Sequence, residues 1–371
     1  MITLPDWLRI ANVAEIDSPA LLIFEERMEG NLRQMIERVG DADRLRPHIK
    51  THKMPRLIRR QLDLGISRFK AATIAESEMC AAAGARDILL AFPPVGPRAE
   101  RLLRLAKRFP DTSFSVTVDD REVGEALARV FHGAGWDIEF LLDIDCGQHR
   151  TGIAAGPAAF ALYRDLATMP GLRPGGLHVY DGHLHDKDPV KRAKDCAAAF
   201  APTDELRRDL LAAGIPVPRI VAGGTPTFPM HARRADVECS PGTCVLWDHG
   251  YATQLPDMGF LPAAALLTRV VSRPLPHRLC LDLGHKAVAS EMPHPRVHLP
   301  QIPDAVFAGH SEEHLLVETP HAEDYPVGTV LFAIPWHICP TVALHSEAVL
   351  VRGGVTVERW KVQARDRRIE I

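Results

Sequence analysis

Short apolar, β-branched runs alternate along the first two thirds of the chain with longer runs whose apolar residues recur three and four positions apart. The first pattern predicts strands and the second predicts amphipathic helices. The eight predicted strands are Leu45–Lys50, Phe69–Ile74, Asp87–Phe92, Ser113–Asp119, Glu139–Asp145, Gly175–Tyr180, Arg219–Gly223 and Val237–Pro241. The predicted helices are Pro55–Leu64, Ala75–Ala83, Pro97–Arg108, Arg121–Ala134, Pro157–Met169 and Pro189–Ala213.

Eight strand–helix units predict an α/β fold, a TIM-like (β/α)8 barrel. The alternative is a doubly wound sheet, which usually has fewer strands and a glycine-rich first turn, and no GxGxxG motif follows the first predicted strand. A strand that runs into a helix, over residues 18–31, precedes the barrel. We therefore expect the barrel domain to span residues 18–250.

After about Tyr251 the pattern changes to short strands without long helices between them. The predicted strands are Thr268–Ser272, Arg278–Asp282, Ala305–Ala308, Leu315–Glu318, Val330–Pro335, Glu347–Arg352 and Val355–Val362. The Gly353–Gly354 pair between the last two predicts a hairpin turn. We expect an antiparallel β domain over residues 251–371, with residues 1–17 packed against it.

Composition excludes several classes of protein. The 371 residues are 46% hydrophobic and 25% charged, as in ordinary globular proteins. A formal net charge of -3 gives no basic excess for binding nucleic acid or an anionic membrane. Neither a signal peptide nor an apolar run of about 18 residues, as a membrane span requires, is evident. Seven scattered cysteines without a CxxC pair favour reduced thiols in the cytoplasm.

Polar and titratable residues follow four of the predicted strands at the end where a barrel forms its active site. The four groups are His48, Lys50, His52 and Lys53; Asp145, Gln148, His149 and Arg150; His178, Tyr180, His183 and His185; and Gly223, Gly224 and Thr225. Lys50 ends an apolar strand, where partial desolvation would make it a Schiff-base nucleophile, although a surface lysine is the simpler interpretation. Gly223–Gly224–Thr225 predicts either a phosphate site or a plain turn. Together, a reactive lysine and a phosphate cradle suggest pyridoxal phosphate.

A second cluster lies in PWHICPTVALH, where His337 and Cys339 are two residues apart. On a strand these side chains would share a face and could bind Zn²⁺ or a similar metal, or they could be an ordinary buried pair. The segment GHSEEHL contains an inverted zinc-peptidase pattern, but it runs into a predicted strand, so peptidase chemistry is not expected. His183 and His185 could also bind a metal, although we favour an acid–base role for one of them.

Eight segments together resemble the D-threonine aldolase and D-serine dehydratase family of pyridoxal-phosphate enzymes, which have the alanine-racemase-like fold. They are SPALLIF, RPHIKTHK, AAG…DILLAFPPVG, DIDCGQHRTG, YDGHLHD, AGGTPTF, ECSPGTCVLWDHGY and PWHICPTVALH. The resemblance runs from about residue 18 to residue 350. It implies that Lys50, rather than Lys53, carries the cofactor and that Gly223, Gly224 and Thr225 hold its phosphate.

The same resemblance implies that Arg150 and Tyr180 flank the pyridoxal ring, that His183 is an acid–base group, and that His337 and Cys339 bind a divalent metal. It also implies a homodimer in which the β domain of one subunit closes on the barrel of the other.

One feature departs from the better-known aldolases of the family, which carry His-x-Asp at the metal pair, whereas this chain carries the His-x-Cys of D-serine dehydratases. Thiolate favours Zn²⁺ and carboxylate favours Mn²⁺. We expect a lyase that cleaves D-β-hydroxy-α-amino acids to glycine and an aldehyde. The alternative is a dehydratase of D-serine or D-3-hydroxyaspartate that releases a 2-oxo acid and ammonia. An amino-acid racemase and a non-catalytic pyridoxal-phosphate carrier are less favoured.

Overall fold

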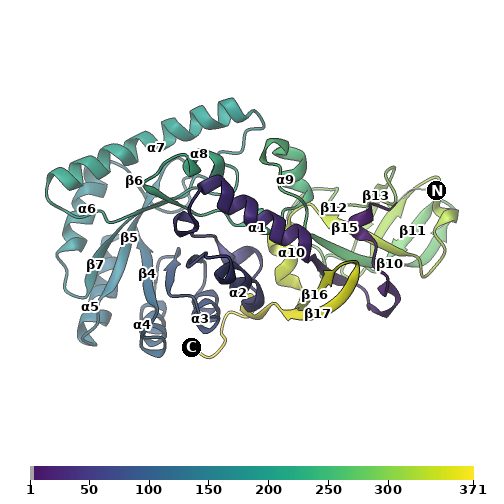
Figure 1. The fold of residues 1–371 in the computed structure, drawn as a ribbon, viewed down its shortest axis with the longest axis horizontal. Coiled ribbons are helices and arrows are strands. Elements are labelled where there is room, and N and C mark those ends of the chain that lie inside the picture. Colours follow the sequence, from purple (N-terminus) through teal and green to yellow (C-terminus); the bar gives the residue numbers. More distant parts are fainter. Residues whose placement is uncertain (1–3) are drawn as a thin grey trace. The chain divides into compact units, whose positions relative to one another are not determined.

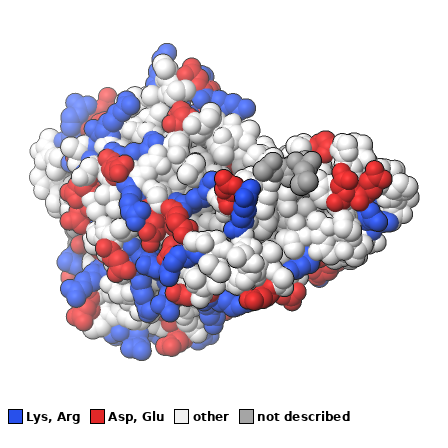
Figure 2. All heavy atoms as spheres, turned by 45° about the vertical axis from the view of Figure 1, so that its right-hand side comes forward, with Lys and Arg blue, Asp and Glu red and all other residues white. Residues whose placement is uncertain are grey.

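The computed structural model describes residues 4–371, which form two compact units (Figure 1). We call residues 35–50, 55–242 and 366–371 the barrel unit. Residues 4–34, 51–54 and 243–365 form the β unit. Acidic and basic side chains are interspersed over the face drawn in Figure 2, as expected for a chain of nearly balanced charge.

The barrel unit is built on a parallel sheet with the strand order β2-β3-β4-β5-β7-β8-β9, and the short strand β6 pairs with β5. The strands are Arg68–Ala71 (β2), Asp87–Leu90 (β3), Ser113–Val118 (β4), Ile138–Asp145 (β5), Ile153–Ala154 (β6), Leu172–Val179 (β7), Ile220–Ala222 (β8) and Val237–Cys239 (β9). Leu89, Leu141 and Val221 form a cluster in the core of this unit. The predicted α/β barrel is confirmed.

Residues 45–48 join the two ends of the parallel sheet through isolated parallel bridges from Leu45 to Cys239 and from His48 to Lys70. The prediction of a regular strand over Leu45–Lys50 is wrong, because Pro47 has no N–H to donate to a ladder and residues Ile49–Thr51 form a 3-10 turn. Lys50 therefore lies on a turn rather than at the end of a strand.

Helices follow the strands of the barrel unit, and the six predicted ones are confirmed to within two residues at each end. The helices are Pro55–Asp63 (α2), Ile74–Ala82 (α3), Arg98–Arg108 (α4), Arg121–Gly133 (α5), Pro157–Ala167 (α6) and Pro189–Ala212 (α7), with a short unpredicted helix, Phe228–Ala232 (α8). Side-chain caps fix several starts: Asp120 accepts from Val123 N–H at α5, and Asp188 accepts from Val190 N–H at α7.

The β unit contains a nine-stranded sheet whose main path is β13-β14-β11-β10-β1-β16-β17, with β15 between β10 and β12. The strands are Ala20–Phe24 (β1), Ala264–Leu275 (β10), Arg278–Leu281 (β11), Val297–His298 (β12), Val306–His310 (β13), Leu315–Glu318 (β14), Val330–Pro335 (β15), Glu347–Arg352 (β16) and Val355–Lys361 (β17). Its helical segments include Glu25–Val39 (α1, which continues into the barrel unit), His249–Gln254 (α9) and Ile338–Leu344 (α10).

The expected antiparallel sheet needs one correction. Strand β1 comes from the N-terminal region and pairs antiparallel with β10 but parallel with β16, so the sheet is mixed. Leu8, Ile10 and Ile16 pack in the same core cluster as β1 and β16. The Gly353–Gly354 turn joins β16 and β17 as predicted, and both glycines have positive φ. Across residues 4–371, no helix is both long and apolar enough to cross a membrane.

Candidate active site

The ring of Tyr180, just after β7, is the centre of the candidate site in the barrel unit. Three cationic groups approach this ring: the amines of Lys50 and Lys70 lie 5.8 Å and 5.5 Å from its centroid, and the guanidinium carbon of Arg150 lies 5.1 Å away. Cations are attracted to the face of an aromatic ring. The structure thus brings together Lys50, Arg150 and Tyr180, three of the residues predicted from sequence.

Arg150 owes its place to a tight turn after β5. The Asp145 carboxylate accepts hydrogen bonds from the N–H groups of Gly147 (2.9 Å) and His149 (3.0 Å), and from the His149 ring (2.8 Å). His149 has a φ of 53°, a left-handed conformation that these bonds stabilise. Arg150 itself is exposed at the end of this turn.

Lys70, on β2, is 1% exposed and was not among the residues predicted from sequence. Its amine contacts Nε2 of His178 (3.5 Å) and donates to the hydroxyl of Ser240. The Nδ1 atom of His178 lies 2.6 Å from Asp143, also buried. Burial and the nearby Lys50 lower the pKa of Lys70 to about 7. The site therefore holds a buried amine, that of Lys70, in addition to the half-buried Lys50.

The loop Gly223–Gly224–Thr225 follows β8 and lies against the Tyr180 ring. A Cβ on Gly224 would sit 3.0 Å from Cε2 of Tyr180, so a side chain there would require the ring to shift by a few tenths of an ångström. The N–H groups of Gly223 and Gly224 donate to Val179 O (2.9 Å) and Asp181 Oδ1 (3.1 Å). The two glycines therefore shape the loop, and both of these N–H groups are bonded to other groups of the barrel unit.

His183, in the loop after β7, is half-buried, and its Nδ1 is a buried atom without a hydrogen-bond partner among residues 4–371. Its Nε2 lies 3.1 Å from the position that a Cβ on Gly147 would occupy. Gly147 has a φ of 120°, so the turn after β5 leaves room for the imidazole. His185, two residues later, is exposed.

His337 and Cys339 lie in the β unit at the start of α10, where His337 is the N-cap residue. The expectation that they share the face of a strand is wrong, because the chain turns into a helix at Ile338, whose N–H donates to the buried Asp248 (3.1 Å). The side chains of His337 and Cys339 nevertheless interact. His337 and Cys339 therefore converge at the start of helix α10, and not on one face of a strand.

The surroundings of this pair suit a metal site. Nδ1 of His337 lies 2.6 Å from Glu291, and Sγ of Cys339 lies 3.1 Å from Thr51 Oγ1 and 3.5 Å from Thr243 Oγ1. Thr51 directly follows Lys50 in the chain. Burial raises the pKa of Cys339, but contacts with His337 and the threonines outweigh burial and lower it. An imidazole backed by a carboxylate, beside a thiol with a lowered pKa, is a donor set for Zn²⁺ or a similar ion.

The inverted zinc-peptidase pattern in GHSEEHL does not form a metal site in the structure. His310 ends β13, and residues 311–314 lead into β14 without forming a helix, so the two histidines do not share a helical face. Nε2 of His310 lies 3.0 Å from the carbonyl of Leu283 and its Nδ1 lies 2.8 Å from Arg296. These contacts explain His310 as a structural residue.

A closed parallel barrel with a lysine and an aromatic ring at its mouth, joined to a β-rich unit, defines the alanine-racemase-like class of proteins. A family described as "Alanine racemase, N-terminal domain" matches residues 23–248, and one described as "Putative serine dehydratase domain" matches residues 263–351. The chain belongs to the D-threonine aldolase and D-serine dehydratase family of pyridoxal-phosphate-dependent lyases.

Relatives of known structure or activity cover nearly the whole chain. A D-threonine aldolase from Arthrobacter sp. is 31% identical over 95% of this chain and 94% of its own. The crystal structure of D-threonine aldolase from Filomicrobium marinum has a TM-score of 0.87 and 30% identity, covering 98% of this chain and 99% of that one. D-threo-3-hydroxyaspartate dehydratase from Delftia sp. HT23 has a TM-score of 0.82 and 26% identity, covering 94% and 97%.

Proposed function

We propose that this protein is a lyase that uses pyridoxal phosphate and a divalent metal to cleave D-β-hydroxy-α-amino acids, as D-threonine aldolase does, into glycine and an aldehyde. The observation that carries the proposal is the convergence of Lys50, Arg150 and Gly224 on the Tyr180 ring, in a chain alignable with D-threonine aldolase over 95% of its length. The absence of a side chain at Gly224 lets this loop lie against the Tyr180 ring, beside the residues that would flank a flat cofactor with an anionic tail.

Each site residue has a role in this proposal. Lys50 would hold the cofactor covalently, Arg150 and Tyr180 would flank its ring, and the loop Gly223–Gly224–Thr225 would receive its phosphate. The Thr225 hydroxyl accepts from Gly242 N–H (3.2 Å), which fixes the orientation of that side chain. When bound, the cofactor supplies an electron sink for negative charge at Cα.

His183 would take the proton from the substrate's β-hydroxyl in the aldolase reaction. Within the described residues 4–371, the buried Nδ1 of His183 has no hydrogen-bond partner, so no structural hydrogen bond holds this nitrogen there. A general base must be within hydrogen-bond reach of the proton it removes. His337 and Cys339 would hold the metal, with Zn²⁺ favoured by the thiolate, and the metal supplies a Lewis acid for the hydroxyl oxygen.

Dehydration is the second candidate, and one observation favours it. Structures are known for two variants of D-threo-3-hydroxyaspartate dehydratase, one with a histidine and one with a cysteine replaced by alanine. The two replaced residues are two positions apart, and the structure of the cysteine variant is described as the metal-free form. His337 and Cys339 have the same spacing. In this reaction Lys50 would remove the Cα proton, and the products would be a 2-oxo acid and ammonia.

Product analysis separates the two candidates. The purified protein is incubated with D-threonine, D-serine and D-3-hydroxyaspartate, with the L-enantiomers as controls. Glycine and an aldehyde from D-threonine support the aldolase, whereas a 2-oxo acid and ammonia from D-serine or D-3-hydroxyaspartate support the dehydratase. Neither product set, or equal turnover of the L-enantiomers, would contradict the proposal.

We further infer that the protein works as a homodimer in the cytoplasm on small D-amino acids. All seven cysteines are free thiols in the structure, which is consistent with a reducing compartment. The mass of the protein in solution, measured by light scattering at several concentrations, tests the dimer. A monomer mass of 40.9 kDa throughout would contradict it.

A further inference from the structure

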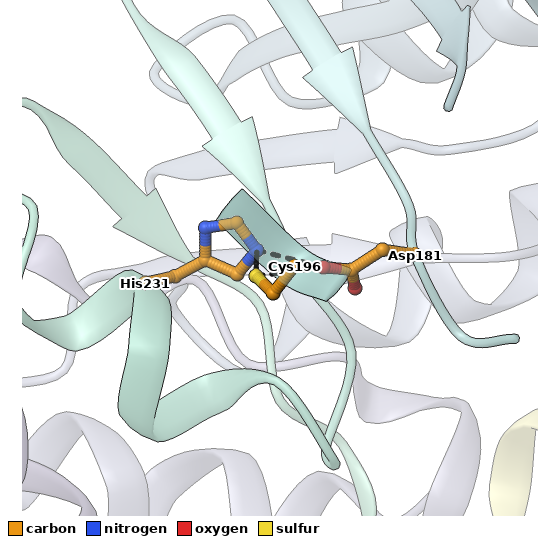
Figure 3. Close-up of side chains that lie close together, drawn as sticks. All are labelled: Asp181, Cys196 and His231. Carbon is orange, nitrogen blue, oxygen red and sulfur yellow. Dashed lines mark hydrogen bonds and ion pairs between the residues drawn. The ribbon is translucent and has the colours of Figure 1, made fainter. Parts of the chain in front are cut away.

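A buried carboxylate lies directly behind the loop Gly223–Gly224–Thr225. Asp181, which follows Tyr180, is 3% exposed, and its Oδ1 accepts hydrogen bonds from Gly224 N–H (3.1 Å) and the Thr227 hydroxyl (2.6 Å). Its Oδ2 lies 2.8 Å from Nε2 of His231 on α8 and 3.7 Å from Sγ of Cys196 on α7 (Figure 3). Four donors therefore converge on one carboxylate.

Both polar groups of the peptide bond between Gly223 and Gly224, the carbonyl and the N–H, form hydrogen bonds. Its carbonyl accepts from the Ser240 hydroxyl (2.8 Å), and its N–H donates to Asp181. Gly223 has a φ of 81°, and a Cβ there would lie 2.6 Å from Cδ2 of His231. The loop thus packs on His231 on one side, while Gly224 meets the Tyr180 ring.

Asp181, Cys196 and His231 could also be considered as metal ligands, since their ligand atoms lie within 4.8 Å of one another. Two observations favour the hydrogen-bonded cluster. The 2.8 Å between Asp181 and His231 is a hydrogen-bond distance, shorter than the roughly 3.3 Å that separates two ligands about 2.0 Å from a tetrahedral zinc. Burial and Asp181 also raise the pKa of Cys196 to about 12, so the thiol keeps its proton at neutral pH.

We propose that Asp181 is a positioning residue that holds the loop Gly223–Gly224–Thr225 in the shape that receives the cofactor's phosphate. This inference rests on the proposed function, because it concerns how the proposed phosphate site is built. Burial alone would raise the pKa of Asp181, but hydrogen bonds from His231, Thr227 and Gly224 hold it below its usual value. A charged acceptor binds its donors more strongly than a neutral one.

The test compares two cofactors that differ only in the phosphate. Dissociation constants for pyridoxal phosphate and for pyridoxal are measured by absorbance on the full-length protein after cofactor removal. We expect Asp181→Ala to weaken pyridoxal phosphate at least tenfold, with little effect on pyridoxal. Asp181→Asn keeps the shape and one acceptor, so its effect should be intermediate. Thr203→Val, at a buried polar position on α7, is the control and should not alter the ratio of the two constants.

The outcomes are separable. A wild-type protein that takes up no pyridoxal phosphate contradicts the proposed function. Wild-type uptake with an unchanged ratio of constants in both Asp181 variants overturns this inference alone, because a merely structural role weakens both cofactors equally. If Asp181→Ala does not fold, the ratio in Asp181→Asn decides. Loss of one tightly bound zinc per chain in Cys196→Ala would replace the hydrogen-bonded cluster by a metal site.

Discussion

Lys50 is one of three amine or guanidinium groups around Tyr180, so the structure offers a sharp test of which lysine carries the cofactor. Lys50→Ala should abolish the visible absorbance of the bound cofactor, because an alanine cannot form the covalent link. Lys53→Ala is the control, since the Lys53 amine lies 3.5 Å from the Ala364 carbonyl in the β unit. Visible absorbance that persists in Lys50→Ala and is lost in Lys53→Ala would reverse the assignment.

His183 and His185 form a natural pair for separating catalysis from structure. His183→Ala should lower the turnover number by roughly 10²–10⁴-fold, the usual contribution of a general acid or base. Cofactor binding should change little, because Nδ1 of His183 has no hydrogen-bond partner among residues 4–371 that its loss would disturb. His185→Ala, exposed and two residues away, should retain most of the turnover. Equal turnover in wild type and His183→Ala would remove His183 from the mechanism.

The sequence indicates the candidate site residues better than it indicates the contacts that hold them in place. Lys50, Arg150, Tyr180 and Gly224 could be predicted because the ends of barrel strands collect functional groups. Lys70 was missed although its signal is present, since a lysine inside an apolar strand run must find buried partners. Those partners lie 108 and 170 residues away, on His178 and Ser240, and no local pattern encodes them.

At helix α10 the predicted secondary structure is wrong, although the two side chains expected to converge, His337 and Cys339, do interact. The run from Val330 to Pro335 is a strand, and extending that strand through Trp336 into His337 and Cys339 was the natural interpretation. The helix begins because Asp248, 90 residues earlier in the chain, accepts from Ile338 N–H, and Pro340 is tolerated in a first turn. A cap supplied from so far along the chain cannot be read from local sequence.

His337 and Cys339, the proposed metal ligands at the start of α10, can be tested by substitution. Cys339→Ser replaces a thiolate by a weaker ligand and should lower metal affinity by more than the 10–100-fold typical of losing a supporting contact. Metal content by mass spectrometry and activity should fall together, while cofactor absorbance stays. Cys280→Ser, on β11, is the control. Full activity of Cys339→Ser after chelation would exclude the metal from the reaction.

For the whole molecule, the barrel was predictable because the hydrophobic pattern of each strand–helix unit is visible in its own stretch of sequence. Its closure was not, because residues 45–48 complete the ring by isolated bridges to β9 and β2 rather than by a regular strand. The sheet of the β unit was predictable only in part. Strand β1, from the other end of the chain, pairs with β10 and β16, and pairing across more than 240 residues leaves no mark in the hydrophobic pattern.

The stability of the whole protein should depend on pH through Lys70. The charged and titratable groups that act on this amine are His178 on β7, Asp143 on β5, and Lys50, Arg46 and Asp181. Burial and Lys50 lower its pKa to about 7 from an ordinary 10.5. Between these values the unfolded chain binds the extra proton and the folded one does not. The free energy of unfolding therefore rises as pH increases from 7 to 10.5, because folding releases a proton from the amine over this range. It falls again as pH returns to 7.

Lys70→Met removes this contribution. Urea unfolding at pH 7 and pH 9.5 should show that the free energy of unfolding of wild type rises relative to the variant by roughly 1 kcal/mol per pH unit. Lys107→Met, at an exposed position on α4, controls for loss of a lysine charge and should follow wild type. Because the same cofactor is present in all three proteins, its own titration cancels in the comparison. Parallel pH profiles for wild type and Lys70→Met would mean that the Lys70 amine stays protonated in the fold, and that the contacts with Asp143 and Asp181 outweigh its burial.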